Sequence, residues 1–408
     1  MPEFAKRMKT MEKSAKVIRN LFGAMSDPDL ISLGGGAPAT EALPVEAVRE
    51  ILNDIMQRET RGQEVLQYGS VMGLKDLREV VVHNLLRPVG IEADLDEIMI
   101  INGGLEAMNL ICQLYIEPGD VILVESPTFV QSVEIFEMFE ARCIGVAMDE
   151  RGMDLEDLKN KIDRYSPKMI YVIPTFQNPS GRTLSLDRRE ALAAIGSERD
   201  IVILEDDPYR DIRYSGETLP PIKTFDQTGH TILANSFSKI FSPGSRLGYI
   251  YASKNVMDRL FDAKTATNSH TGIMPQMVCA EFFKRGYYES HHKMICDLYR
   301  ERRDTMVAAI DEYFPEGTRR VYPHGGLFTW VELPGGINTT DLLEEAVSNP
   351  LVKVAFVAGE GFFVGGDGKG SNAMRISFGS VPPDRIIEGI KRLGRLIEAK
   401  LSHPEAER

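Results

Sequence analysis

Short apolar runs alternate with charged, amphipathic stretches through the middle of the chain. The runs are VILVE (121–125), MIYVIP (169–174), IVILE (201–205), TILAN (231–235) and LGYIYA (247–252), and stretches such as LEDLKNKIDRY and SLDRREALAAI separate several of them. Short apolar runs of this kind indicate buried strands, and the amphipathic stretches between them indicate helices. The alternation predicts an α/β fold in which a mainly parallel sheet lies between helices.

The pattern changes after about residue 285. HHKMICDLYRERRDTMVAAIDEYF predicts a long charged helix, and it is followed by the strand-like segments GGLFTWVELP, VKVAFVAG and AMRISFG and by a closing helix in PPDRIIEGIKRLGRLIEAKLS. We therefore predict a large domain over 45–285 and a smaller α+β domain formed by 1–44 and 286–408. His291 and His292 lack metal-ligand partners at a useful spacing, so we expect them to be solvated and expect no metal site.

Composition narrows the class of protein. The chain has 408 residues, which suggests two or three domains, and its net charge of −13 without a basic tail argues against nucleic-acid binding. No apolar run is long enough to span a membrane, and the N-terminal MPEFAKRMKTMEKSAK lacks the apolar region of a secretory signal. Four cysteines without CxxC spacing (Cys112, Cys143, Cys279 and Cys296) indicate buried thiols in a reducing compartment, so we expect a cytoplasmic protein.

Chemically useful residues follow the ends of the predicted strands. IMIIN is followed by GGLEAMNLICQLYI, VILVE by SPTF, IYVIPTF by QNPSG, IVILE by DDPY, and TILAN by SFSK. Ligands of open parallel sheets bind beyond the carboxyl ends of the strands. We therefore expect these segments to meet at one rim of the sheet.

Two of these segments, together with the loop after SFSK, contain residues that can bind an anion. Gly103 and Gly104 open a helix, whose free N–H groups suit a phosphate. Ser236, Ser238 and Arg246 can donate to the same anion.

The remaining groups suit a flat heteroaromatic aldehyde. Phe129 offers a flat face, Asp206 can hold a protonated ring nitrogen, Asn178 and Tyr209 can bond a phenolic oxygen, and Lys239 can form an imine. A phosphate, a planar ring, a ring nitrogen, a phenolic oxygen and an aldehyde together describe pyridoxal 5′-phosphate.

Several motifs carry a resemblance to a known family. SFSKIFSPGSRLGY, QNPSGRT, EDDPYRDI and MRISFGS resemble those of class I/II aminotransferases of fold type I, and ISLGGGAPATEALP and LQYGSVMGL resemble its 2-aminoadipate/kynurenine aminotransferase branch. The similarity extends from about Arg19 to the last helix. It implies a large domain that binds pyridoxal phosphate around a seven-stranded type of sheet, with a smaller α+β domain.

The resemblance also implies roles for individual residues. Lys239 would be the Schiff-base lysine and proton shuttle, Asp206 would pair with the ring nitrogen, and Tyr209 and Asn178 with the phenolic oxygen. The phosphate would be held by Ser236, Ser238, Arg246 and the backbone amides of the Gly103–Leu105 turn, namely those of Gly104 and Leu105. The family branch commonly has Ser-Gln at Gly104-Leu105 and often Tyr at Phe129, so this chain has fewer side-chain donors there.

Other implied roles concern the substrate and a second subunit. Arg375 would clamp the substrate α-carboxylate, which a planar guanidinium suits better than an ammonium group, with Gly36 and Asn178 beside it. Arg19 matches an arginine that touches acidic substrates in some relatives. Tyr68 would reach the phosphate of the neighbouring subunit, which implies a homodimer with composite active sites.

Each of these residues also has a simpler interpretation. Lys239 alone reads as a surface lysine, Arg375 as a member of a structural ion pair, Tyr68 as an ordinary buried tyrosine and Arg19 as a solvated helix charge. Their combination in one chain favours the functional interpretation for Lys239.

The implied activity is transfer of an amino group from an L-amino acid to a 2-oxo acid, with 2-oxoglutarate as the expected acceptor, by a ping-pong mechanism through the Lys239 Schiff base. A lyase, decarboxylase or racemase that uses the same cofactor remains an alternative. A regulator domain that binds the cofactor without catalysis is a further alternative; thirty residues precede Ile31, fewer than a winged-helix domain needs.

Overall fold

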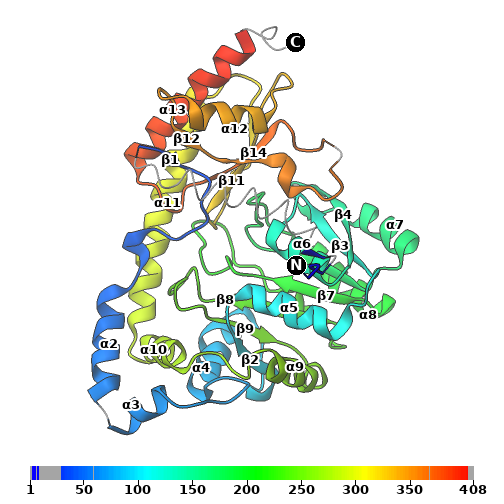
Figure 1. The fold of residues 1–408 in the computed structure, drawn as a ribbon, viewed down its shortest axis with the longest axis vertical. Coiled ribbons are helices and arrows are strands. Elements are labelled where there is room, and N and C mark those ends of the chain that lie inside the picture. The colour runs from blue at the N-terminus through cyan, green and yellow to red at the C-terminus, as the bar shows by residue number, and fades with distance from the viewer. Residues whose placement is uncertain (1, 6, 9–28, 58, 367, 403–408) are drawn as a thin grey trace.

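The computed structural model describes residues 2–5, 7–8, 29–57, 59–366 and 368–402. Its centre is an eight-stranded sheet in the order β2-β9-β8-β7-β6-β3-β4-β5 (Figure 1). The bounds are β2 Ile98–Ile101, β9 Gly248–Tyr251, β8 Thr231–Ser236, β7 Val202–Asp206, β6 Met169–Val172, β3 Val121–Ser126, β4 Arg142–Asp149 and β5 Gly152–Met153. The five central strands from β8 to β4 are parallel, whereas β9 and β5 run antiparallel to their neighbours. The predicted α/β class is confirmed, and the two-residue edge strand β5 brings the total to eight strands.

Helices cover both faces of the sheet. One face carries α5 (Gly104–Tyr115) and α6 (Val130–Met138), and the other carries α7 (Leu155–Tyr165) and α8 (Leu186–Arg199). Residues that alternate along β6 enter the two cores in turn, so Met169 and Tyr171 lie on the α6 side while Ile170 and Val172 lie on the α7 and α8 side. Continuous apolar runs therefore form this sheet because each strand is buried on both sides.

The remaining helices of this part lie below and beside the sheet in Figure 1. They are α2 (Val45–Gln57), α3 (Glu59–Val65), α4 (Lys75–Val80), α9 (Lys254–Thr267) and α10 (Ile273–Lys284). The long helix α11 (Tyr287–Tyr313) then runs from α10 towards the C-terminal part of the chain.

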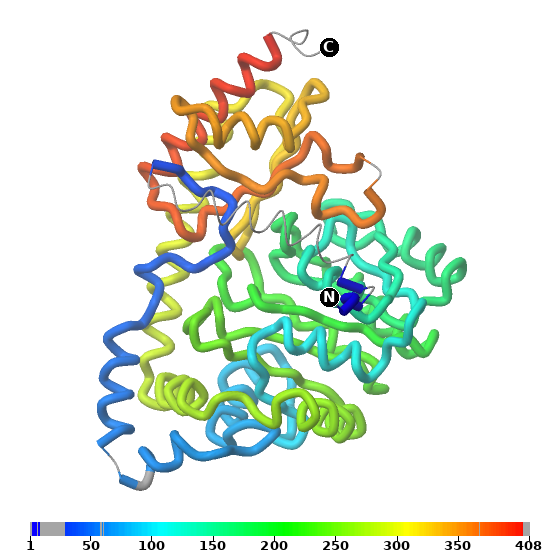
Figure 2. Tube along the Cα trace, in the orientation of Figure 1, coloured from blue at the N-terminus to red at the C-terminus, as the bar shows by residue number. Residues whose placement is uncertain are grey.

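The C-terminal part contains its own antiparallel sheet, in the order β10-β11-β14-β13. Its elements are β10 Arg319–Arg320, β11 Phe328–Glu332, α12 Thr339–Ser348, β12 Val354–Ala355, β13 Val357–Ala358, β14 Ala373–Ser377 and α13 Pro383–Ser402. The strand β1 (Ile31–Ser32) pairs in parallel with β12, and the tube in Figure 2 shows this early blue segment beside the red helix α13. The segment around Ile31 thus joins the C-terminal part of the chain; the predicted domain limits at 44/45 and 285/286 stay predictions.

Two details differ from the expectations drawn from the sequence. His291 is buried and packs edge-on against the ring of Phe282, and His292 is half-buried with Nε2 bonded to the carbonyl oxygen of Asp211, because α11 turns this face towards the neighbouring segments rather than to solvent. All four cysteines are free, but Cys143 is only half-buried. Within the described part of the chain, no helix is both long and apolar enough to cross a bilayer.

Candidate active site

Lys239 lies in the turn that connects β8 to β9. The β8 strand ends at Ser236, and the chain then turns so that the half-buried side chain of Lys239 donates from Nζ to the carbonyl oxygen of Gly36 at 2.8 Å. The same Nζ lies 5.9 Å from the ring centre of Tyr209. Burial lowers the pKa of Lys239 to about 8, and the positive charges of Arg375 and Arg246 add to the effect. A larger fraction of this lysine is therefore neutral near neutral pH than of an ordinary lysine, and the neutral amine is the form that can accept a proton.

Asp206 is the last residue of β7, and its buried side chain points to the α6 side of the sheet. Its Oδ2 accepts a hydrogen bond from the hydroxyl of Tyr171 at 2.8 Å, and that hydroxyl in turn accepts one from Ser132 at 2.9 Å. Burial raises the pKa of Asp206 to about 7; the hydrogen bond from Tyr171 opposes this rise and the charge of Asp207 adds to it. A cationic partner would hold such a carboxylate in its charged form.

Arg375 in β14 joins the small sheet to the large one. Its Nη1 donates to Oδ1 of Asn178 at 2.8 Å, and its Nη2 donates to the carbonyl oxygen of Gly34 at 2.6 Å. The guanidinium lies 4.4 Å from the ring centre of Phe328, and its Nε is buried without a hydrogen-bond partner. Burial lowers the pKa of Arg375 to about 10. No salt-bridge partner of Arg375 occurs among the described residues, and its hydrogen bonds there go to Asn178 and Gly34.

Tyr209 and Gly36 complete this cluster around Phe328. The Tyr209 ring packs edge-on against Phe328 with 5.7 Å between the ring centres, and burial raises its pKa above the ordinary value. A Cβ added to Gly36 would lie 3.1 Å from Cζ of Phe328. The missing side chain at Gly36 therefore leaves the space in front of that ring open.

The residues predicted to bind an anion include those at the start of α5, and the set Gly103–Leu105, Ser236, Ser238 and Arg246 is called the phosphate cradle below. Gly103 has φ of 81°, a conformation that favours glycine, and a Cβ there would lie 2.5 Å from Nη2 of Arg246. Gly103 at the N-cap of α5 has no side chain that could accept from the first amides, and among the described residues no heavy atom lies within 4 Å of a Cβ built on Gly104. Ser236 and Ser238 are buried and share a hydrogen bond of 2.9 Å between their hydroxyls. The exposed Arg246, the two hydroxyls and the helix amides form a donor set that fits a phosphate.

Comparisons with known proteins decide the family. Residues 28–393 match the family described as aminotransferase class I and II. This chain belongs to that family. Aromatic-amino-acid aminotransferase 1 of Thermococcus litoralis is 37% identical over 398 residues, which cover 96% of this chain and 94% of that protein. The 2-aminoadipate transaminase of Thermus thermophilus is 32% identical over 392 residues, covering 95% of each chain.

A solved structure gives the same result for the fold. The crystal structure of Pyrococcus horikoshii kynurenine aminotransferase in complex with PMP superimposes with a TM-score of 0.91 at 37% identity, covering 98% of this chain and 97% of that one. The aminotransferase described here is therefore a pyridoxal-phosphate-dependent transferase of fold type I.

The donor set of this aminotransferase fits that cofactor. The cradle at α5 offers amides and hydroxyls without a bulky side chain at Gly104. The buried carboxylate of Asp206 could pair with a positive ring nitrogen. Lys239 has an amine that can react with an aldehyde.

Of the three remaining predicted residues, Phe129 and Tyr68 belong to the described part of the chain and Arg19 does not. Phe129 is half-buried at the N-terminus of α6, where it packs on the main core. Tyr68 is 87% exposed and touches only the edge of His270 among ring partners in the described chain, so the interpretation as an ordinary buried tyrosine is wrong. Arg19 lies outside the described residues.

Sequence reasoning missed three contributors to the site. Tyr171 bonds Asp206, Phe328 packs on Arg375 and Tyr209, and the carbonyl of Gly34 fixes the guanidinium. A polar hydroxyl within the apolar run MIYVIP was the available signal for Tyr171, because a buried hydroxyl needs a partner. Phe328 and Gly34 gave no comparable signal.

Proposed function

We propose that this aminotransferase moves the amino group of an L-amino acid to a 2-oxo acid, with 2-oxoglutarate as the acceptor, in two successive half-reactions at Lys239. One observation carries the assignment of the site. The amine of Lys239 bonds the carbonyl of Gly36, and the guanidinium of Arg375 bonds the carbonyl of Gly34, so a base and a carboxylate-binding group reach the same three-residue segment. An α-amino acid carries its carboxylate and its transferable proton on neighbouring atoms, which matches this pairing.

Pyridoxal 5′-phosphate supplies an aldehyde that bonds amines and a ring that accepts electrons. The residues that would hold it are the amides of Gly103, Gly104 and Leu105 with Ser236, Ser238 and Arg246 at the phosphate, Phe129 at the ring face, Asp206 at the ring nitrogen, and Asn178 and Tyr209 at the phenolic oxygen.

The protein's own groups then have separate tasks. Lys239 accepts the substrate α-proton and returns it, because its lowered pKa of about 8 leaves an appreciable neutral fraction near neutral pH. Arg375 binds the substrate carboxylate, since its two Nη groups are already oriented by Asn178 and Gly34 and its planar fork suits bidentate pairing. Arg19 as a contact to acidic side chains stays a prediction.

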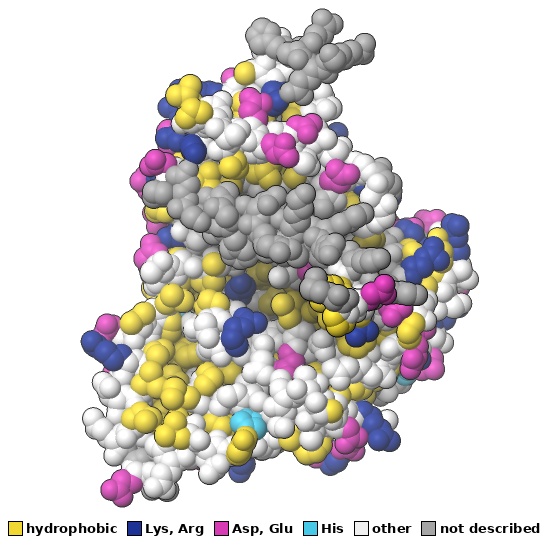
Figure 3. Space-filling model, viewed as in Figure 1, with side chains coloured by type: hydrophobic (Ala, Val, Ile, Leu, Met, Phe, Trp, Pro, Cys, Tyr) yellow, Lys and Arg dark blue, Asp and Glu magenta, His cyan; other side chains and the backbone are white. Residues whose placement is uncertain are grey.

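We also propose that the active protein is a homodimer in the cytoplasm. Tyr68 projects from the surface, which suits a residue that completes a neighbour's phosphate site. Figure 3 shows hydrophobic side chains gathered on the same face as α2 and α10, and the exposed large hydrophobic residues of the α2–α10 region include Met56, Leu66 and Met274. An apolar face of this kind favours burial against a second copy.

The test is product analysis with a panel of amino acids and 2-oxoglutarate. Formation of glutamate and the donor's 2-oxo acid in equal amounts supports the proposal. Double-reciprocal plots of initial rate against donor concentration should give parallel lines at different concentrations of 2-oxoglutarate, as two successive half-reactions require. Release of ammonia, carbon dioxide or the mirror-image amino acid as the main product would favour a lyase, decarboxylase or racemase instead.

A variant pair identifies the lysine. Lys239→Ala should lose essentially all turnover and the borohydride-reducible attachment of the cofactor. Lys254→Ala, which removes an exposed lysine of α9, should retain both. Full activity of Lys239→Ala would contradict the assignment.

A further inference from the structure

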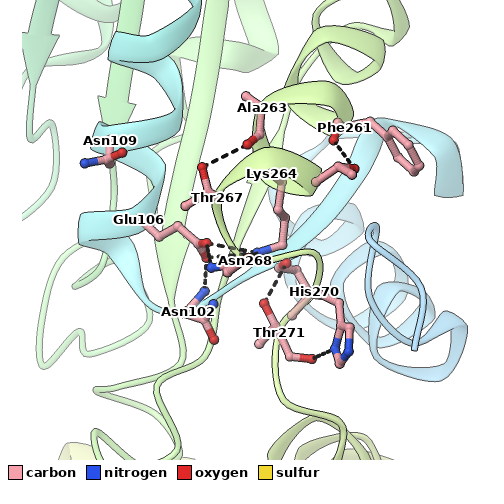
Figure 4. A network of polar contacts seen from close by, with 12 residues as sticks. Asn102, Glu106, Asn109, Phe261, Ala263, Lys264, Thr267, Asn268, His270 and Thr271 are labelled. Atoms are coloured by element: carbon pink, nitrogen blue, oxygen red, sulfur yellow. Dashed lines mark hydrogen bonds and ion pairs between the residues drawn. The ribbon is translucent and has the colours of Figure 1, made fainter. Parts of the chain in front are cut away.

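A buried lysine lies behind the proposed phosphate cradle. Lys264 in α9 has a fully buried side chain, and its Nζ lies 3.0 Å and 3.1 Å from the two carboxylate oxygens of Glu106 in the first turn of α5. The same Nζ donates to Oδ1 of Asn268 at 3.2 Å. Figure 4 shows Lys264 reaching from α9 towards the start of α5, where these groups meet.

Glu106 connects this ion pair to the glycine turn. Its carboxylate accepts hydrogen bonds from the backbone N–H of Asn102 and from the side-chain amide of Asn268. Asn102 directly precedes Gly103 and Gly104, whose turn begins α5. The carboxylate is therefore held at the end of the helix where the cradle lies (Figure 4).

A lone carboxylate at this position would work against the cofactor. An acidic group in the first turn stabilises a helix, but its charge repels an anion bound at the same helix end. Solvent screens the interaction weakly, because the side chains of Lys264 and Glu106 are both buried. Lys264 cancels the charge while leaving Glu106 free to fix the backbone of Asn102.

We propose that Lys264 is a positioning residue that neutralises Glu106, so that the glycine turn of α5 is held rigidly and still accepts the phosphate of the cofactor. Burial lowers the pKa of Lys264, and the charge and hydrogen bond of Glu106 oppose that effect. The inference rests on the proposed cradle of Gly103–Leu105 and Arg246.

The experiment compares how tightly variants hold pyridoxal 5′-phosphate and pyridoxal, which lacks the phosphate. Purified holoenzyme is diluted, and loss of each compound is followed by its visible absorbance. Lys264→Met should release pyridoxal 5′-phosphate about ten-fold faster than the wild type, equivalent to about 1.4 kcal/mol, while its affinity for pyridoxal changes little. Lys254→Met, at an exposed lysine of the same helix, is the matched control and should behave as the wild type.

A second substitution separates charge from geometry. Glu106→Gln keeps an acceptor for the N–H of Asn102, so the double variant Lys264→Met with Glu106→Gln should regain retention to within about two-fold of the wild type. The proposal is overturned if the double variant releases pyridoxal 5′-phosphate as fast as Lys264→Met does. It is also overturned if Lys264→Met releases the cofactor no faster than the wild type. If Lys264→Met alone does not fold, a ten-fold loss in the double variant still overturns it.

Arg246→Met distinguishes this inference from the assignment on which it depends. If Arg246→Met retains pyridoxal 5′-phosphate normally, the cradle itself is wrongly placed. If Arg246→Met loses it and Lys264→Met does not, only the role of Lys264 is rejected.

Discussion

Nη1 of Arg375 in β14 lies 2.8 Å from Oδ1 of Asn178, which follows β6 in the large sheet. One hydrogen bond thus connects a strand of the C-terminal sheet to the rim of the central sheet. Because the same guanidinium bonds the carbonyl of Gly34 near the N-terminal strand, three distant parts of the chain meet at Arg375. A substrate carboxylate bound there would contact all three parts at once.

Replacing Arg375 tests this arrangement. Arg375→Lys keeps a positive charge but loses the planar fork, so we expect kcat/KM for all amino acids to fall about a hundred-fold, or about 2.7 kcal/mol in transition-state stabilisation. Retention of pyridoxal 5′-phosphate should change little. Steady-state kinetics measure the first effect. The control is Arg320→Lys, because Arg320 lies in β10 and pairs with Asp311 of α11. An unchanged kcat/KM would contradict the substrate role.

The lowered pKa of Lys239 predicts how the cofactor-free protein captures pyridoxal 5′-phosphate. Only the neutral amine attacks an aldehyde, and a pKa reduced from 10.5 to about 8 makes that form appear at lower pH. The capture rate should therefore rise about ten-fold per pH unit below pH 8 and level off above about pH 9. Stopped-flow absorbance between pH 6 and pH 10 measures it.

A charge variant supplies the control for that titration. Arg375→Gln removes a nearby positive charge, so the protonated form of Lys239 becomes easier to maintain and the midpoint should move to higher pH. A wild-type midpoint near 10.5, the value of an ordinary lysine, would show that Lys239 is not buried among cations.

Tyr171 predicts a second pH effect, at Asp206. Its hydroxyl bonds the carboxylate and opposes the rise in pKa that burial causes, so Tyr171→Phe should raise the pKa of Asp206 further above about 7. The affinity of the cofactor-free protein for pyridoxal 5′-phosphate should then show an acid limb shifted to higher pH, with a loss of about ten-fold near pH 6 and a smaller loss near pH 8. Tyr165→Phe, a tyrosine of α7 that packs beside Arg142 and Arg164, should leave the profile unchanged. A parallel loss at every pH would point to packing instead.

Tyr68 predicts complementation between subunits. Lys239→Ala and Tyr68→Ala should each be nearly inactive, but a hybrid dimer contains one site with both wild-type residues. Co-expression should therefore restore about a quarter of wild-type activity when subunits mix at random. Activity of the purified mixture measures this recovery.

The control for complementation uses two residues of the same proposed site. Lys239→Ala with Asp206→Asn places one defect in every hybrid site, so no recovery is expected. Recovery in this control, or none with Tyr68→Ala, would mean that the sites are not shared as proposed.

Much of the site could be predicted because strand ends are visible in the sequence. Asp206 and Ser236 are the final residues of β7 and β8, and these parallel strands bring Asp206 and the turn that carries Lys239 to the same rim. The glycine pair that opens α5 was also evident, since glycine at a helix start permits the positive φ found at Gly103.

The acidic run EDD shows what the sequence alone left undecided. Glu205 and Asp206 are neighbours, yet Glu205 accepts the backbone N–H groups of Ile222 and Lys223 on one side of the sheet, whereas Asp206 meets Tyr171 on the other. Strand pleating guarantees that they point apart, but only the sheet and its helices decide which side holds the site.

The α/β class, the aspartate at the end of β7, the lysine in the turn after β8 and the glycine turn followed from the sequence alone, because these depend on local patterns of burial and backbone freedom. Only the folded structure shows that Arg375, Asn178 and Gly34 share one set of hydrogen bonds, that Lys264 pairs with Glu106, and that Tyr68 faces outward. Contacts of this second kind join segments far apart in the chain, and only the packing of both sheets and their helices fixes which of many distant polar groups become partners.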